Sequence, residues 1–502
     1  MILFLKGTVK MNKKILASLL ALLMAGSMAL TSCGGSGDSG TNAGNDTAAD
    51  TTTAAETVPE ETKPQLELPE GIDLKGDEIN LAVQQSAGWV QQRDFTFSEE
   101  ASGEPINDAA KERIQLVEDM LNCKIVSIEV GASAAVATSA RTEIMAGGDS
   151  YDVIMPGMAN INTLGTEGLL YDLYTIDNID TTKPWWSQQV TKGLSIGGKL
   201  YFTLGDLSLI DNDGIGAIGF NKKLVEDYNL DSPYQYVFDG TWTMDKLFKM
   251  ANAVVKDLNG DGTMDANDQY GFVNDAQNLM YHVIGGGVNL TDKDENDLPV
   301  CKLNNERTIQ IIDSFINFIS GDAFAQTSLF GGHEPCNTNF MNDQMLFRMT
   351  TMYRFTQMRN METDFGFVTT PKFDESQDSY HHGYSYASPG TAIPVTVKDP
   401  EAVGAAVEAL SYYGRELMLP AYYDVTLQGK VARDDESAAV LDILFDTAML
   451  DLGTLYNFGG IRDIWVGMVN AKSNTFSSSF EAISGNVDKA IEDLVKTVEA
   501  LD

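Results

Sequence analysis

Six oxygen-bearing residues between positions 257 and 268 have the spacing of a calcium-binding loop. They are Asp257, Asn259, Asp261, Thr263, Asp265 and Asp268. Ca²⁺ takes about six to eight oxygen ligands. Gly262 permits the sharp turn that folds such ligands inward, and Thr263 would contribute its backbone carbonyl. The spacing predicts a structural calcium ion, because the loop supplies nearly every ligand itself. The alternative is an acidic, glycine-rich turn without an ion.

The end of this loop departs from the usual pattern in two ways. Its last ligand is Asp268 where such loops usually have glutamate, so bidentate reach is shorter and a lower affinity is expected. The exit, Tyr270-Gly271-Phe272, has the residue types of a strand rather than a helix. We therefore expect only the first half of a helix–loop–helix unit.

The segment before Cys33 has the parts of a bacterial export signal. A basic start, Met11-Asn12-Lys13-Lys14, precedes the apolar stretch ILASLLALLMAGSMA, and Leu30-Thr31-Ser32 stands directly before the cysteine. The apolar stretch is too short to span a bilayer comfortably, which favours a cleaved signal over a membrane helix. We expect residues 1–32 to form the signal peptide, with Met11 as the initiator.

Leu30-Thr31-Ser32-Cys33 resembles the lipobox of bacterial lipoproteins, in which the thiol takes a diacylglyceryl group and becomes the mature N-terminus. The alternative is an ordinary signal followed by an incidental cysteine. Residues 33–75 read as a disordered linker, since Gly, Ser, Thr, Ala, Asp, Glu and Pro leave almost nothing to bury. We expect the protein at the extracellular face of the cell membrane, tethered by this lipid.

The composition is strongly acidic and poor in cysteine. Of 502 residues, 72 are Asp or Glu and 34 are Lys or Arg, which gives a formal charge of −38. Such a charge argues against nucleic acid as a partner and against electrostatic adhesion to anionic lipid. The three cysteines after Cys33 are too few for a disulfide scaffold. Cys301 and Cys336 could pair, or they could remain thiols.

Strand-like and helical segments alternate from Glu78 onward. Strands are expected at 79–83, 124–130, 151–155, 198–205, 215–221, 364–370 and 391–396, with helices at 243–256, 306–319 and along the C-terminal segment. An amphipathic helix separates the first two strands, with Ala110, Ile114, Val117 and Leu121 on one stripe. This order predicts an α/β fold with a mainly parallel sheet covered by helices on both faces.

Other motifs are weak signals. GIGAIG (214–219) has spaced glycines, but they lie inside a strand-like run, so no nucleotide site is expected. GYSYA (383–387) falls short of a nucleophile elbow because Ala387 stands in place of the last glycine. The four histidines are scattered, without a zinc-type cluster. Trp89 is the better candidate, since it follows the first strand at the edge where open α/β sheets bind ligands.

Several longer segments occur in the order found in one known family. They are YDVIMPGM (151–158), GGKLYFTLGDLSL (197–209), GFNKKLVEDYNL (219–230), GTWTMDKLFKMA (240–251), DFGFVTTPKFDESQ (364–377) and AYYDVTLQGKVARDDESAAVLDILF (421–445), together with the calcium-type loop. From about residue 76 onward the chain resembles the carbohydrate-type extracellular solute-binding proteins that feed ABC importers, especially the lipoprotein forms of Gram-positive gut bacteria.

The resemblance implies a two-lobed periplasmic-binding-protein-like fold of the class II type, with a ligand cleft between lobes joined by crossing hinge segments. Lobe 1 would comprise residues 76–215 and 370–412, and lobe 2 residues 216–369 and 413–502. The implied ligand-binding residues are Trp89 and Asp206 from lobe 1 and Tyr353, Arg354 and Trp465 from lobe 2.

The leading hypothesis is a monomeric receptor, not an enzyme, that captures a sugar or oligosaccharide and delivers it to the permease of an ABC importer. The rival is a lipid-anchored glycan hydrolase, whose retaining mechanism needs two carboxyls about 5–5.5 Å apart, one of them with a raised pKa. A third hypothesis keeps the fold and changes the solute to a peptide, a polyamine or a metal chelate. A neutral sugar suits the aromatic candidates better than a cation does, because aromatic faces stack on apolar sugar faces.

We expect Cys33→Ala to release the protein from the membrane or to leave its signal uncleaved, because the lipid requires the thiol. Membrane fractionation and mass spectrometry of the mature N-terminus measure both outcomes. A Cys33→Ala protein that still carries a diacylglyceryl group would contradict the assignment.

Overall fold

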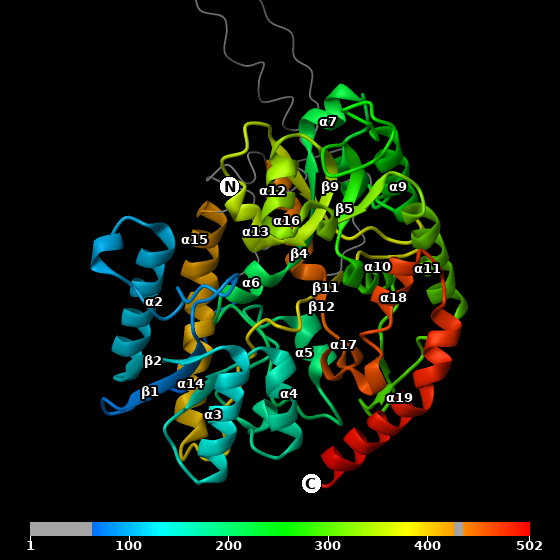
Figure 1. The fold of residues 1–502 in the computed structure, drawn as a ribbon. Helices are drawn as coiled ribbons and strands as arrows, with labels where there is room; N and C mark the ends of the chain where they lie inside the picture. The colour runs from blue at the N-terminus through cyan, green and yellow to red at the C-terminus, as the bar shows by residue number, and fades with distance from the viewer. Residues whose placement is uncertain (1–62, 426–434, 502) are drawn as a thin grey trace, which may run out of the picture. The chain divides into compact units, whose positions relative to one another are not determined.

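Two β-sheets organise the residues that this computed structural model describes, 63–425 and 435–501 (Figure 1). The first sheet has the strand order β2-β1-β3, and the second has the order β10-β4-β9-β5-β8. We call the body around the first sheet lobe 1 and the body around the second lobe 2. The predicted signal peptide, Cys33 and the linker as far as residue 62 lie outside the described residues.

Lobe 1 is built from parallel βαβ units. Its elements are β1 Glu78–Gln84, η1 Glu99–Ala101, α2 Pro105–Leu121, β2 Lys124–Gly131, α3 Ser133–Met145, β3 Val153–Met155, α4 Met158–Thr166, η2 Leu173–Thr175, α5 Gln188–Leu194 and α14 Pro400–Tyr413. Strand β1 pairs in parallel with both neighbours. Leu81, Ala82 and Val83 in β1 are all fully buried, as expected of a parallel strand covered on both faces. The strands predicted at 79–83, 124–130 and 151–155 are confirmed.

Lobe 2 contains a mixed sheet. Its elements are β4 Gly216–Asn221, α7 Lys222–Asp227, α8 Pro233–Phe238, α9 Met244–Ala253, β5 Tyr270–Asn274, η3 Ala276–Asn278, α10 Leu279–Gly285, β6 Asp292–Lys293, β7 Pro299–Val300, α11 Glu306–Ile319, β8 Phe324–Gln326, η4 Thr327–Phe330, α12 His333–Met341, β9 Met345–Thr351, α13 Met352–Gln357, β10 Phe365–Val368 and α16 Asp435–Thr447. Strand β5 is parallel to β8 and β9, whereas β4 is antiparallel to β9 and β10.

Helix α11 shows how local sequence sets an element of lobe 2. The Asn305 side chain accepts the N–H of Thr308 at 3.0 Å, which caps the helix start. Ile312, Phe315 and Ile319 are buried on one face. The helix predicted at 306–319 is therefore confirmed with the same bounds.

The lobes are connected by segments that run between the two sheets. The remaining elements are α6 Ile210–Gly214, β11 His382–Gly383, η5 Gly414–Met418, α15 Leu419–Tyr423, β12 Ala448–Met449, α17 Leu452–Tyr456, η7 Phe458–Gly460, α18 Trp465–Ala471 and α19 Phe476–Glu499. Helix α6 leads directly into β4, and β11 pairs in parallel with β12. Among the described residues, no helix combines the length and the hydropathy that a membrane crossing needs.

The stretch 63–75, predicted as part of the disordered linker, lies against the body instead. Leu74 is buried, and its N–H donates to the carbonyl of Leu121 at 2.8 Å. Lys183 pairs with Glu67 at 2.9 Å. Leu66, Leu68 and Ile72 also pack on the core. The composition averaged over 33–75 is polar, so it did not reveal these apolar residues. They lie close together in the sequence and pack on the body as one segment.

Three other predictions need correction. Residues 198–205 and 391–396 form single bridges such as Thr203–Thr391 rather than strands, because each is too irregular for a continuous ladder. Residues 370–383 were predicted in lobe 1, but the N–H of Lys372 donates to the carbonyl of Trp242 in lobe 2 at 3.1 Å. Residues 414–423 were predicted in lobe 2, but η5 and α15 pack on α2 in lobe 1.

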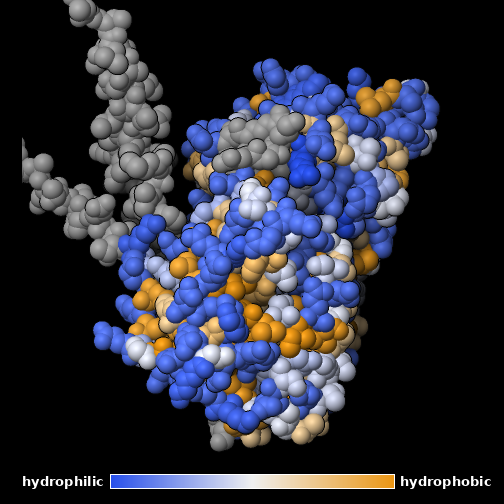
Figure 2. All heavy atoms as spheres, turned by 90° about the vertical axis from the view of Figure 1, so that its left-hand side faces the viewer, coloured by the Kyte–Doolittle hydropathy of each residue, from blue (hydrophilic) through white to orange (hydrophobic). Residues whose placement is uncertain are grey.

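The surface on the side of α2 is mixed. Figure 2 shows this side with many hydrophilic residues over lobe 2 and hydrophobic residues interspersed over lobe 1. Leu116 and Met120 of α2 belong to the exposed apolar residues. Apolar side chains that are exposed singly are common on protein surfaces, so these two carry no functional assignment.

A buried carboxylate joins α14 to the rest of lobe 1. Glu408 accepts the indole N–H of Trp185 at 2.8 Å and that of Trp186 at 2.9 Å. All three side chains are buried. Burial raises the pKa of Glu408 to about 7, although both indole donors oppose the shift. The carboxyl group therefore titrates near neutral pH in the folded protein.

We expect Glu408 to make the folded state less stable as the pH rises. Its ordinary pKa is 4.5 and its folded pKa is about 7, so the folded state binds the proton more tightly. The resulting stabilisation is complete below pH 4.5 and is lost as the pH rises through 7, a change of roughly 3 kcal/mol. Urea unfolding at several pH values measures this effect. The free energy of unfolding should fall more steeply with rising pH in the wild type than in Glu408→Gln.

The matched control is Glu481→Gln, which removes an exposed carboxylate from α19. Its free energy of unfolding should depend on pH as steeply as that of the wild type. A constant loss of stability in Glu408→Gln is expected, because an amide can accept only one of the two indole N–H groups well. Equal slopes in the wild type and Glu408→Gln would contradict the raised pKa.

Candidate functional site

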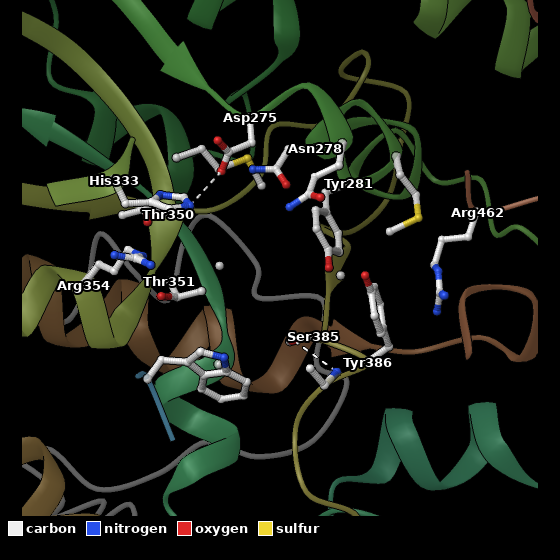
Figure 3. A pocket seen from close by; sticks show the side chains of 18 of the residues that line it. Asp275, Asn278, Tyr281, His333, Thr350, Thr351, Arg354, Ser385, Tyr386 and Arg462 are labelled. Carbon is white, nitrogen blue, oxygen red and sulfur yellow. Dashed lines mark hydrogen bonds and ion pairs between the residues drawn. The ribbon is translucent and has the colours of Figure 1, made fainter. Parts of the chain in front are cut away.

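A cavity of about 410 Å³ lies where the two lobes and their connecting segments meet (Figure 3). Its walls come from the loop after β1, the α6–β4 junction, the segment after β5, the start of α12, the end of β9, α13, the segment 383–387 and the residues around the start of α18. Carboxyl ends of strands in open α/β sheets are a common ligand site, and both β1 and β5 end here. The volume is within the range of about 300–1,000 Å³ usual for ligand pockets.

A buried polar network holds the loop that carries Trp89. The Asp94 carboxylate is fully buried and accepts the hydroxyl of Ser208 at 2.6 Å and the backbone N–H before α6 at 3.0 Å. Arg93 pairs with Asp213 in α6 at 2.6 Å. Burial raises the pKa of Asp213 to about 6, against the opposing charge of Arg93. The loop is thus joined to the segment that enters β4.

Glycines in the 214–219 motif make room for aromatic rings. A Cβ at Gly214 would lie 3.0 Å from the indole of Trp89, and a Cβ at Gly219 would lie 2.3 Å from the ring of Phe355. Trp89 therefore rests directly on the α6–β4 junction. The motif serves packing, in agreement with the expectation that it is not a nucleotide-binding loop.

Two tyrosines form a second aromatic wall. Tyr281 of α10 passes so close to β11 that a Cβ at Gly383 would lie 2.1 Å from its ring. Tyr386 follows β11, and the guanidinium carbon of Arg462 lies 4.0 Å from the centre of its ring. In Figure 3 the two phenol hydroxyls point to the same part of the cavity. Stacked guanidinium groups and rings of this kind hold each other in position.

The opposite wall is polar. His333 at the start of α12 lies 3.8 Å from the carboxylate of Asp275, which follows β5. Burial lowers the pKa of His333, while Asp275 works against that shift. The imidazole is therefore neutral at neutral pH and can both donate and accept hydrogen bonds. Arg354 of α13 pairs with the exposed Glu334 at 3.1 Å.

A buried arginine lies behind this wall. Arg348 of β9 is fully buried and donates to the side-chain oxygen of Asn337 at 3.1 Å and to the thiol of Cys336. Burial raises the pKa of Cys336 to about 11, so the sulfur stays protonated. Cys123, Cys301 and Cys336 are all unpaired. Of the two alternatives left open by the sequence, free thiols are the one observed.

The cavity includes two of the five predicted ligand-binding residues. Trp89 and Arg354 line it from lobe 1 and lobe 2. Tyr353 is half-buried and does not line the cavity. Asp206 also lies outside, where it accepts a hydrogen bond from Arg415 at 2.9 Å. Its carboxylate is thus used to attach η5 to lobe 1.

Trp465, the fifth predicted residue, belongs to the core. It is 1% exposed and stacks on Phe476 with ring centres 6.0 Å apart. Its neighbours Arg462 and Val466 line the cavity instead. Helical geometry turns adjacent residues toward different surroundings, so the predicted Trp465 faces the core while residues beside it face the cavity.

Several cavity residues were not predicted as ligand-binding. They are Asp275, Asn278, Tyr281, His333, Tyr386 and Arg462. A signal was present for Asp275 and Asn278, since they come soon after the strand that Tyr270-Gly271-Phe272 predicted, at the kind of strand edge that favoured Trp89. No local signal distinguishes Tyr386 or Arg462, which reach the cavity only through long-range folding.

The 257–268 loop is closed by its own hydrogen bonds. Asp257 accepts the N–H of Gly260 at 2.6 Å and that of Gly262 at 2.8 Å, and both glycines have positive φ angles. Asp268 is buried and accepts the N–H of Leu258 and of Asp265, which lowers its pKa. Strand β5 follows, as the exit sequence predicted. Across residues 63–425 and 435–501, no three His, Cys, Asp or Glu side chains converge as a metal site. Calcium binding stays a prediction from the ligand spacing.

No protein-family model matches the chain, and no curated protein matches its sequence. Solved structures match its fold. A cyclo/maltodextrin-binding protein in complex with maltotetraose is 15% identical with a TM-score of 0.54, covering 85% of this chain and 97% of that chain. A sugar transporter from Rhizobium etli in an open conformation is 13% identical with a TM-score of 0.55, covering 85% and 100%. An ABC substrate-binding protein from Listeria monocytogenes in complex with cycloalternan is 13% identical with a TM-score of 0.50, covering 84% and 99%.

At these identities the likeness establishes the fold. The chain has the two-lobed, periplasmic-binding-protein-like α/β fold of these solute-binding proteins. The predicted fold class is confirmed, and so is the resemblance to carbohydrate-type solute-binding proteins at the level of the fold.

If the 257–268 loop binds calcium, the ion should raise the melting temperature and a chelator should lower it, because binding to the folded state stabilises it by mass action. The double variant Asp257→Ala, Asp261→Ala should lose this response. Thermal unfolding with and without calcium measures it. The calcium-dependent difference is the relevant quantity, since Asp257 also closes the loop without an ion.

Asp294→Ala is the matched control, because Asp294 accepts the backbone N–H groups of Asn296 and Leu298 in another acidic turn. It should keep the calcium response of the wild type. If neither calcium nor a chelator changes the melting temperature of the wild type, the loop is an acidic turn without an ion.

Proposed function

We propose that this protein is a membrane-tethered solute-binding receptor that captures a sugar or oligosaccharide and delivers it to the permease of an ABC importer. The observation that carries the proposal is the cavity between the lobes, whose lining combines aromatic side chains with hydrogen-bonding groups. Relatives in fold support it, since two of them are complexes with maltotetraose and cycloalternan. These relatives are binding proteins rather than enzymes.

The side chains of the cavity suit a saccharide. Trp89 and Tyr386 offer flat faces on which the apolar face of a sugar ring stacks. Asn278, Thr351 and Ser385 offer amide and hydroxyl groups that donate and accept hydrogen bonds with sugar hydroxyls. Polar groups held at fixed points of a pocket are the usual basis of orientation and specificity.

Ligand binding would favour closure of the lobes. A saccharide that touches Trp89 from lobe 1 and Thr351 from lobe 2 makes its full set of contacts only when the lobes are close together. The connecting segments 214–216 and 383–387 border the same cavity, so closure and binding would be coupled directly. Tethering rests on the export signal and Cys33, and places the receptor outside the membrane.

We expect Trp89→Ala and Tyr386→Ala each to weaken binding of a saccharide by about threefold to tenfold, because stacking of an aromatic ring contributes modestly beyond its buried area. Melting temperatures should change little. Isothermal calorimetry is the measurement, with a saccharide chosen because it raises the melting temperature of the wild type.

Two controls separate binding from folding. Tyr174→Ala truncates an exposed ring outside the cavity and should leave the affinity unchanged. Trp465→Ala should lower the melting temperature strongly, since it empties a core position. Unchanged affinity in both cavity variants would remove these rings from the site. Release of sugar from glycans by the purified protein would favour the hydrolase hypothesis. If only peptides or cations in a ligand panel bind, the hypothesis that the solute is a sugar would be contradicted.

A further inference from the structure

Three hydrogen-bond donors meet at one end of the cavity. They are the hydroxyls of Tyr281 and Tyr386 and the guanidinium group of Arg462, which we call the donor cluster. Arg462 lies 4.0 Å from the ring centre of Tyr386 and uses one N–H to reach the carbonyl of Thr454 at 3.0 Å. In Figure 3 the ring of Tyr386 lies between Arg462 and Tyr281. The geometry brings one positive charge and two phenols to the same wall.

The donor cluster has no acceptor of its own. In the described part of the chain, Arg462 forms no ion pair with a carboxylate, and neither phenol hydroxyl donates to a protein acceptor. Burial raises the pKa of Tyr281, so its hydroxyl keeps the proton at neutral pH. The three side chains are half-buried, and a donor without a protein acceptor is left for a ligand or for water.

The missing carboxylate is unusual for this chain. Acidic residues outnumber basic ones by 72 to 34, so an arginine near the surface usually has a carboxylate close by. Arg354, on the opposite wall, follows that expectation, because Glu334 pairs with it at 3.1 Å. Arg462 departs from that expectation, since no ion pair joins it to a carboxylate of the described residues.

The other charged groups of the cavity do not neutralise Arg462. Asp275 lies against His333 on the opposite wall, at 3.8 Å. Asp463 is exposed and accepts the side-chain N–H of Asn457 at 2.7 Å. Arg462 therefore keeps a charge-assisted donor for a ligand.

On the basis of the proposed sugar-binding function, we propose that the donor cluster binds an anionic group of the saccharide, a uronate carboxylate or a sulfate ester. The planar guanidinium of Arg462 can donate to two oxygens of such a group, and the two phenol hydroxyls can donate to the oxygens that remain. Trp89, which also lines the cavity, would stack on a sugar ring of the same ligand. The preferred solute is then an acidic oligosaccharide rather than a neutral one.

Calorimetry at low ionic strength tests this preference. The ligands are trimers of galacturonate, glucuronate and mannuronate, the same trimers after reduction of their carboxyl groups, and a sulfated galactan trimer. We expect at least one acidic trimer to bind about tenfold or more tightly than its neutral counterpart, as a charge-assisted hydrogen bond would give. Tight binding of the sulfated trimer alone would identify the sulfate as the anionic group.

Variants test whether the preference for acidic over neutral trimers depends on the donor cluster. Arg462→Gln should bring the ratio of acidic to neutral affinity close to one, and Tyr386→Phe, which keeps the ring, should lower the ratio without changing binding of the neutral trimer. Arg354→Gln is the matched control and should keep the ratio of the wild type, because Arg354 is already paired. Melting curves exclude a loss of folding in Arg462→Gln, which also loses its bond to Thr454.

Each result decides one question. Equal affinity for acidic and neutral trimers would overturn the anionic subsite and leave the sugar receptor standing. A preference that survives in Arg462→Gln and disappears in Arg354→Gln would overturn the assignment to the donor cluster. Binding of no saccharide, acidic or neutral, would overturn the proposed function and the anionic subsite together.

Discussion

The candidate site depends on a carboxylate that is buried without contact to solvent, that of Asp94. A buried polar group needs hydrogen-bond partners, and Asp94 obtains them from Ser208 and from the backbone before α6. Arg113 of α2 is also fully buried and donates to the carbonyls of Leu207 and Asp94. Burial lowers the pKa of Arg113 to about 10, so it remains charged at neutral pH. This network joins the loop after β1, helix α2 and the start of α6, and it holds Trp89 against the cavity.

Burial also decides which groups of the cavity carry charge. The pKa of Tyr281 is raised and that of His333 is lowered mainly by burial, so both side chains are neutral at neutral pH. Two guanidinium groups line the cavity, those of Arg354 and Arg462, and of these two only Arg354 has a carboxylate partner. Neutral donors, flat aromatic faces, the guanidinium group of Arg462 and the carboxylates of Asp275 and Asp463 form a surface suited to holding a ligand in one orientation.

Much of the fold could be predicted because its causes are local. The three strands of lobe 1 and helix α11 follow from hydrophobic periodicity within a few turns of chain. The boundaries of the two lobes were harder to predict from the sequence. Residues 370–383 and 414–423 have ordinary local patterns, and their lobe is decided by distant partners such as Trp242 and α2. The stretch 63–75 was mistaken for linker because an average over many residues conceals a few apolar ones.

By itself the sequence predicted an export signal, and it determined the acidic charge, much of the strand and helix order and the position of Trp89 after the first strand, since each depends on neighbouring residues. Only the tertiary structure decided which side chains face the cavity. Trp465 is buried while Arg462, three residues earlier, lines the wall. Glu408 meets Trp185 and Trp186, and Tyr386 meets Arg462, across long stretches of chain. Contacts of this kind depend on how two sheets and their connecting segments pack together, and no local pattern of residues records that packing.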